Sequence, residues 1–103
     1  MYLFGGSNLE QDNKKFYTLE LNTFKWDVVK VRGEQPPTRD EHTAVFYESE
    51  GSMIIFGGFI HGVRTNELDK YLFQENKWVK VNVASGQKQP KPRSGHSSVI
   101  NQG

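Results

Sequence analysis

Short apolar runs separated by polar turns recur along the whole chain. Thr43–Tyr47 and Met53–Phe56 are rich in β-branched and aromatic residues, and the polar, glycine-containing segment Glu48–Ser52 separates them. Runs of this length and composition, bounded by turn residues, are typical of antiparallel strands. The pattern therefore predicts a first and a second strand joined by a tight turn.

Two further kinds of strand follow in the same order. Phe16–Leu21 and Leu68–Phe73 form the third kind, and Trp26–Val31 and Trp78–Val83 form the fourth. In Trp78–Val83, the apolar residues Val79, Val81 and Val83 alternate with the polar residues Lys80 and Asn82, as in a half-buried strand. The alternative for residues 66–73 is a helix. Because Tyr71, Leu72 and Phe73 are consecutive rather than three and four apart, the strand is favoured.

An internal repeat organises these strands. Gly57-Gly58 follows Gly5-Gly6 by 52 residues, and Trp78 follows Trp26 by the same distance. Arg39–Val45 returns as Arg93–Val99 after 54 residues. Several anchors that agree on a period of about 50 residues indicate four-stranded propeller blades.

The repeated residues resemble the Kelch family of β-propeller repeats. The family marks are a strand that ends in Gly-Gly, a downstream aromatic and a Trp, here Gly57-Gly58, Tyr71 and Trp78. The resemblance implies an all-β fold of two four-stranded antiparallel sheets, as repeats over about residues 1–47 and 48–103. It departs from the pattern where Asp69 stands in the place of Tyr17.

The motif residues are expected to be structural. Glycine reaches backbone conformations with positive φ and allows close approach of a neighbouring chain. We expect Trp26 and Trp78 to be buried at equivalent positions, where one blade packs on the next. His42 and His96 are a whole blade apart, so they are predicted to be hydrogen-bonding framework groups rather than ligands of one metal. The structural set comprises Gly5, Gly6, Trp26, Gly57, Gly58, Tyr71 and Trp78.

Composition excludes several functions. The 103 residues carry 13 basic and 12 acidic side chains without any run of like charges, which argues against nucleic-acid binding. No apolar stretch is long enough for a membrane-spanning helix, and the first residues do not resemble a signal peptide. The absence of cysteine excludes disulfides and thiolate chemistry and agrees with the expected cytoplasmic location.

The long loops are expected to lie on one face, because the ends of the second and fourth strands of a meander point the same way. These loops are Ser7–Lys15, Gly33–Glu41, Phe59–Asn66 and Ala84–Gly95. Long loops on a rigid sheet scaffold commonly carry binding residues, and Kelch propellers use this face for partners. The candidates for partner contact are Asn8, Lys14, Arg39, Asp40, His61, Arg64, Arg93 and Ser94. Arg39 and Arg93 could instead bind groups within the fold.

The predicted function is a protein–protein interaction or scaffold module that binds a protein or peptide. No catalytic residue, metal site or cofactor is expected. The chain has no cysteine for the Cys–Tyr crosslink of galactose-oxidase-like propellers, no nucleophile elbow and no phosphate-binding loop. The alternative is a pair of structural blades from a larger Kelch-containing enzyme, phosphatase-like or oxidase-like, whose active residues lie elsewhere.

Two blades do not close a propeller, which has about 4–8 of them. We therefore expect the remaining blades either in the same chain, as part of a longer propeller, or from homo-oligomerisation. The chain is predicted to enter in a second strand at Tyr2-Leu3-Phe4 and to reach a first strand at Val99-Ile100.

Overall fold

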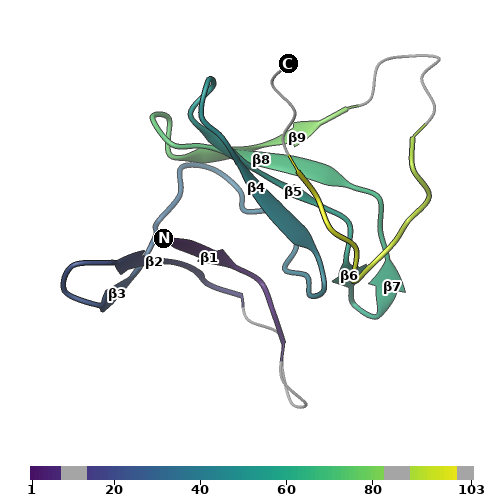
Figure 1. Ribbon diagram of the computed structural model, residues 1–103, viewed down its shortest axis with the longest axis horizontal. Coiled ribbons are helices and arrows are strands. Elements are labelled where there is room, and N and C mark those ends of the chain that lie inside the picture. The colour runs from purple at the N-terminus through teal and green to yellow at the C-terminus, as the bar shows by residue number, and fades with distance from the viewer. Residues whose placement is uncertain (8–13, 83–88, 100–103) are drawn as a thin grey trace.

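A computed structural model describes residues 1–7, 14–82 and 89–99, which form nine antiparallel strands (Figure 1). The strands are β1 (Tyr2–Phe4), β2 (Phe16–Glu20), β3 (Lys25–Val28), β4 (Thr43–Tyr47), β5 (Ser52–Phe56), β6 (Phe59–Ile60), β7 (Val63–Arg64), β8 (Leu68–Leu72) and β9 (Lys77–Val81). The described residues contain no α-helix, and so none that could cross a membrane. The all-β prediction is confirmed.

Two meanders and one small hairpin make up the topology. One sheet has the order β1-β2-β3, the second has the order β4-β5-β8-β9, and β6 pairs with β7. Both large sheets keep the same register 52 residues apart. Leu3 opposes Tyr17 as Ile55 opposes Asp69, so the repeat holds even where Asp69 replaces an aromatic residue.

The first sheet has three strands within the described residues, whereas four were predicted. In the second sheet β4 occupies the outer edge of β5, but no described strand lies on the same edge of β1. The strand at β3 is also shorter than predicted and ends at Val28. After it the chain turns inward, because Val29 and Val31 pack against the core between the sheets.

Aromatic side chains form the core where the two sheets face each other. Phe4 and Phe16 from the first sheet lie against Tyr71 and Trp78 from the second, and each of these four side chains is at most 8 % exposed. The ring centroids of Phe4 and Trp78 are 4.9 Å apart, as are those of Phe16 and Tyr71. Tyr71 and Trp78 therefore have the buried structural role that the repeat predicted.

The predicted burial of Trp26 is wrong. Its side chain is 50 % exposed, although its position in the repeat matches that of Trp78, which is 8 % exposed. Trp26 opposes Leu19 on β2, on the face of the first sheet that points away from Phe4 and Phe16. Within the described residues, the second sheet covers only the face of the first sheet that carries Phe4 and Phe16. The ring of Trp26 therefore meets only the ring of Tyr17, in a T-shaped contact.

Paired glycines join one blade to the segment that leads into the next. Gly5, Gly6, Gly57 and Gly58 all have positive φ, as their predicted role requires. The Gly6 amide donates to the Arg39 carbonyl at 2.7 Å, and the Gly58 amide donates to the Arg93 carbonyl at the same distance. A Cβ on Gly57 would lie 2.5 Å from the His96 ring, so a larger residue would collide there.

The two repeated histidines are part of this framework. His96 Nε2 lies 3.0 Å from both the Thr43 hydroxyl and the Phe56 carbonyl, and the His42 ring lies edge-on to Phe4. Burial, and next the charge of Arg39, lower the pKa of His42 from its ordinary value of 6.5. Both histidines are thus positioned by contacts within the fold.

Candidate functional site

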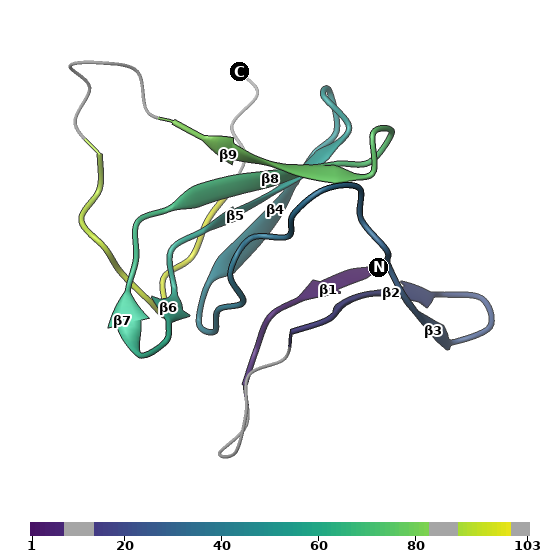
Figure 2. The same cartoon turned by 180° about the vertical axis from the view of Figure 1, so that it is seen from behind.

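The loops that follow the second and fourth strands meet at one edge of the molecule. The β6–β7 hairpin projects there beside the end of β1 and the start of β4, on the side opposite the β4–β5 and β8–β9 turns (Figures 1 and 2). We call this region the loop edge; its described members are Ser7, Asp40, Glu41, Phe59–Arg64 and Arg93–Gly95. The described residues of these loops that are named here therefore lie together.

Backbone hydrogen bonds hold the loop edge together. Asp40 and Phe59 exchange both of their backbone hydrogen bonds, at 2.8 and 3.2 Å, and so form an isolated bridge. The Ser7 hydroxyl donates to the Asp40 carboxylate at 3.1 Å, and the Gly95 amide donates to the Glu41 carbonyl at 2.9 Å. Segments from both blades are thus fixed relative to one another.

Arg64 is an exposed cation at the loop edge, and two neighbouring side chains hold its guanidinium group in place. Its guanidinium carbon lies 5.2 Å from the centre of the Phe59 ring, a cation–π contact. Its Nε donates to the Ser94 hydroxyl at 3.3 Å. Arg64 forms no ion pair with any residue that the structure describes. The guanidinium is therefore positioned but not neutralised.

The segment that carries His61 was predicted as part of a long loop, but it forms a tight hairpin between β6 and β7. His61 and Gly62 have φ of 51° and 79°, the two positive values typical of a two-residue hairpin turn. His61 is exposed at the tip. The hairpin places Phe59 opposite Arg64. Sequence analysis missed Phe59 because it did not recognise the turn dipeptide His61-Gly62, which β7 follows directly.

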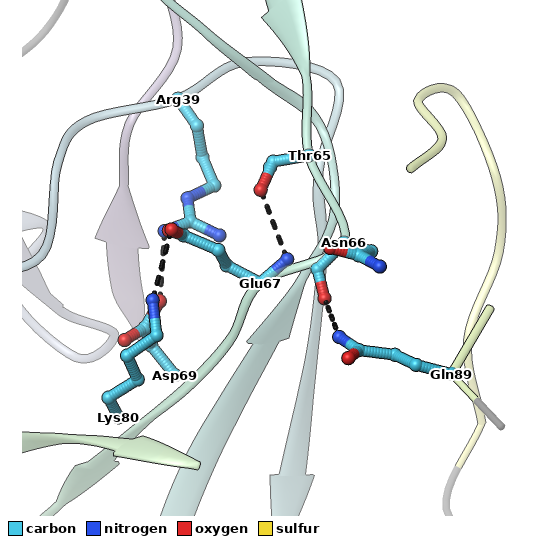
Figure 3. A network of polar contacts seen from close by, with 7 residues as sticks. All are labelled: Arg39, Thr65, Asn66, Glu67, Asp69, Lys80 and Gln89. Atoms are coloured by element: carbon cyan, nitrogen blue, oxygen red, sulfur yellow. Dashed lines mark hydrogen bonds and ion pairs between the residues drawn. The ribbon is translucent and has the colours of Figure 1, made fainter. Parts of the chain in front are cut away.

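Arg39 was predicted as a candidate for partner contact, with binding inside the fold as the alternative, and the structure supports the alternative. It is 2 % exposed, and its Nη2 lies 2.9 Å from Asp69 Oδ2 and 3.7 Å from Glu67 Oε2. Glu67 also pairs with Lys80 at 3.0 Å, so the contacts form a network (Figure 3). Because β8 carries Asp69 beneath the loop edge, Arg39 binds a carboxylate within the fold rather than one on a partner.

The repeat-equivalent Arg93 behaves differently. Arg93 is exposed, and its Nε donates to the Lys91 carbonyl at 3.1 Å. It forms no ion pair within the described part of the chain. Of the two arginines that the repeat relates, one supports the fold and the other is accessible to a partner.

The remaining candidates divide into three groups. Asp40 and Ser94 are half-buried members of the loop edge. Lys14 is exposed, and its carbonyl accepts a bond from Gln35 at 3.1 Å, which ties it to the linker before β4. Asn8 lies outside the described residues, so its expected role stays a prediction. The loop edge thus joins His61, Arg64, Arg93 and Ser94 to Asp40.

The chemistry of the loop edge is that of polar recognition. It offers the guanidinium groups of Arg64 and Arg93 beside the carboxylates of Asp40 and Glu41, and Glu41 was not among the predicted residues. Among residues 1–7, 14–82 and 89–99, no group of three or more His, Asp or Glu side chains is arranged to hold a metal ion.

Repeated meanders, glycine pairs that bond to the segment leading into the next meander and aromatic packing between the sheets are features of Kelch-type propeller blades. The chain belongs to the Kelch-repeat family: a family model described as the KLHDC2/KLHL20/DRC7 Kelch-repeats domain matches residues 1–103.

Relatives with Kelch-type similarity come from plants and animals. The chain is 29 % identical to acyl-CoA-binding domain-containing protein 4 of Arabidopsis thaliana over 96 % of its own length and 14 % of that protein. It is 31 % identical to host cell factor homolog hcf-1 of Caenorhabditis elegans over 96 % of its length and 15 % of the relative. For human host cell factor 1 the values are 32 %, 94 % and 6 %. The chain thus spans a small part of each relative.

Proposed function

We propose that the chain is a protein-interaction module that binds a polar, charged segment of a partner protein at the loop edge. Its membership of the Kelch-repeat family supports the general class. The observation that carries the location is Arg64, which is exposed yet held by Phe59 at 5.2 Å and by Ser94 at 3.3 Å. A guanidinium that is already ordered loses less conformational entropy when it binds a carboxylate.

The surroundings of Arg64 favour a protein partner of mixed charge. Asp40 and Glu41 lie in the same hydrogen-bonded frame as Arg64 and Arg93, so both signs of charge are presented together. A phosphate backbone would be repelled by the acidic pair, whereas a peptide with neighbouring basic and acidic residues matches it. Arg64 is assigned the role of anchor, because arginine is enriched among the residues that dominate interface energies.

The test is selection from a random peptide library, followed by calorimetric titration of the selected peptides. We expect Arg64→Ala to weaken binding at least about tenfold and to change the free energy of unfolding by less than about 0.5 kcal/mol, as for other surface residues. Lys25→Ala is the matched control, since Lys25 is an exposed cation on β3 outside the loop edge. Selected peptides that bind the Arg64→Ala chain as tightly as the parent would contradict the proposal, as would a library without binders.

A further inference from the structure

Ser94 is a residue of the loop edge whose hydroxyl group contacts a cation. Its Oγ accepts a hydrogen bond from Arg64 Nε at 3.3 Å. The preceding residue, Arg93, is exposed and forms no ion pair within the part of the chain that the structure describes. Two guanidinium groups without a carboxylate partner are therefore associated with one serine, the first through its hydroxyl and the second through the chain.

The internal repeat places an acidic residue at the position that corresponds to Ser94. Arg39-Asp40 returns as Arg93-Ser94 after 54 residues. The backbone is held alike at both places, because a glycine amide, from Gly6 in one case and Gly58 in the other, donates to the carbonyl of the arginine at 2.7 Å. The repeat thus accommodates a negative charge in one copy at the position that is a serine in the other.

A second serine at the loop edge has the opposite surroundings. The Ser7 hydroxyl donates to the Asp40 carboxylate at 3.1 Å, so a phosphate on Ser7 would face a like charge. A phosphate on Ser94 would face Arg64. A phosphate adds a charge of about −1.5 to −2 at pH 7 and three acceptor oxygens, which the planar guanidinium group binds in a forked geometry. Of these two serines, Ser94 has the surroundings that favour a phosphate.

Glu41 opposes a phosphate at this position. A Cβ on Gly95 would lie 4.0 Å from Glu41 Oε1, so this carboxylate is close to the chain beside Ser94. Two guanidinium groups, of Arg64 and Arg93, stand against it, and Arg64 already contacts the Ser94 hydroxyl. A single phosphate on Ser94 therefore meets a cation first, whereas an extended phosphate backbone would also have to pass the acidic residues of the loop edge.

The segment that carries Ser94 is accessible to a modifying enzyme. Described residues 89–95 contain no strand and run beside the β6–β7 hairpin (Figures 1 and 2). Ser94 is half-buried, and its neighbours on both sides are exposed. Lys91 and Arg93 stand three residues and one residue before the serine. This segment therefore offers basic residues beside a serine that lies outside regular secondary structure.

We propose that Ser94 is a phosphorylation site whose phosphate pairs with Arg64 and closes the loop edge to a carboxylate of the partner. In the transfer, Ser94 Oγ bonds to the γ-phosphorus of ATP held by a protein kinase. The bond from that phosphorus to the bridging oxygen of ADP breaks, and the hydroxyl proton passes to a carboxylate of the kinase. This regulation rests on the proposed function, in which Arg64 is the anchor for the partner.

Mass spectrometry tests whether Ser94 accepts a phosphate. The folded chain is incubated with ATP and with protein kinases that select basic residues before serine. We expect phosphate at Ser94, and we expect its loss when Lys91→Ala and Arg93→Ala are combined, because these residues supply the positive charge before the serine. A parent chain that gains no phosphate at Ser94 overturns the proposal.

Phosphorus NMR tests the contact with Arg64 without any partner. Phosphoserine is installed during translation at position 94 or, as the matched control, at position 97, where Ser97 is also exposed. The phosphate at position 94 should lose its second proton at a lower pH than the control phosphate, because a neighbouring guanidinium stabilises the dianion. Arg64→Ala should bring the two titrations together. Titrations that already coincide in the parent chain contradict the pairing with Arg64.

Calorimetric titration tests the effect on partner binding, with the library peptides that bind the unmodified chain. Phosphate at position 94 should weaken their binding at least about tenfold, as Arg64→Ala does, whereas phosphate at position 97 should not. An unchanged affinity overturns the proposed closure of the loop edge. A library without binders refutes the proposed function instead, and the incorporation and the NMR titration then decide whether Ser94 is a phosphate site paired with Arg64.

Discussion

Replacing the two repeated tryptophans by alanine should affect stability very differently. Trp78 is 8 % exposed and Trp26 is 50 % exposed, a difference of 42 percentage points. For a side chain that can bury about 250 Å², this corresponds to about 105 Å² of additional burial. At about 25 cal/mol per Å², Trp78→Ala should cost roughly 2.6 kcal/mol more than Trp26→Ala. The cavity left between Phe4, Phe16 and Tyr71 adds to this, which brings the total loss for Trp78→Ala to about 3–5 kcal/mol.

Urea denaturation of both variants measures this difference, with intrinsic fluorescence and circular dichroism as parallel probes. The two residues are their own matched control, since they have the same side chain at the same place in the repeat. Equal losses of free energy of unfolding in the two variants would refute the assignment of the two faces.

Three other predictions concern stability. Arg39→Ala should lower the free energy of unfolding by about 3–5 kcal/mol, because Asp69 would be buried without its counter-charge; a loss in urea denaturation no larger than that of Arg93→Ala would contradict this. Since the pKa of His42 is lowered in the folded chain, the unfolded chain takes up the proton first. Stability should thus be full above pH 6.5 and decline as the pH falls below it, and His42→Gln should flatten this slope in melts at pH 7.5 and 5.5. Gly57→Ala should lower the melting temperature more than Gly51→Ala. The backbone φ is almost the same, 74° at Gly57 and 73° at Gly51, but of the two positions only residue 57 has other atoms within reach of an added Cβ. Equal losses would show that this crowding is unimportant.

Much of the candidate site could be anticipated from loop positions. The repeat placed the long loops at one edge, and the structure joins Asp40, Arg64 and Ser94 there. Phe59 was missed because its role depends on the hairpin that sets it opposite Arg64. Arg39 was misassigned because a loop position does not reveal that a carboxylate from β8 lies beneath it.

The sequence by itself determined most strands of the two large sheets, their order and the repeat that relates the sheets. These follow from local alternation, turn residues and the 52-residue repeat, which act between neighbouring segments and need no knowledge of distant contacts. The exposure of equivalent residues was decided only by the tertiary structure. Trp26 and Trp78 have the same local sequence signal, but a sheet packs on one face of Trp78's blade and not on the matching face of Trp26's. Burial depends on which surfaces meet, and a repeat presents the same side chain whether or not a neighbour covers it.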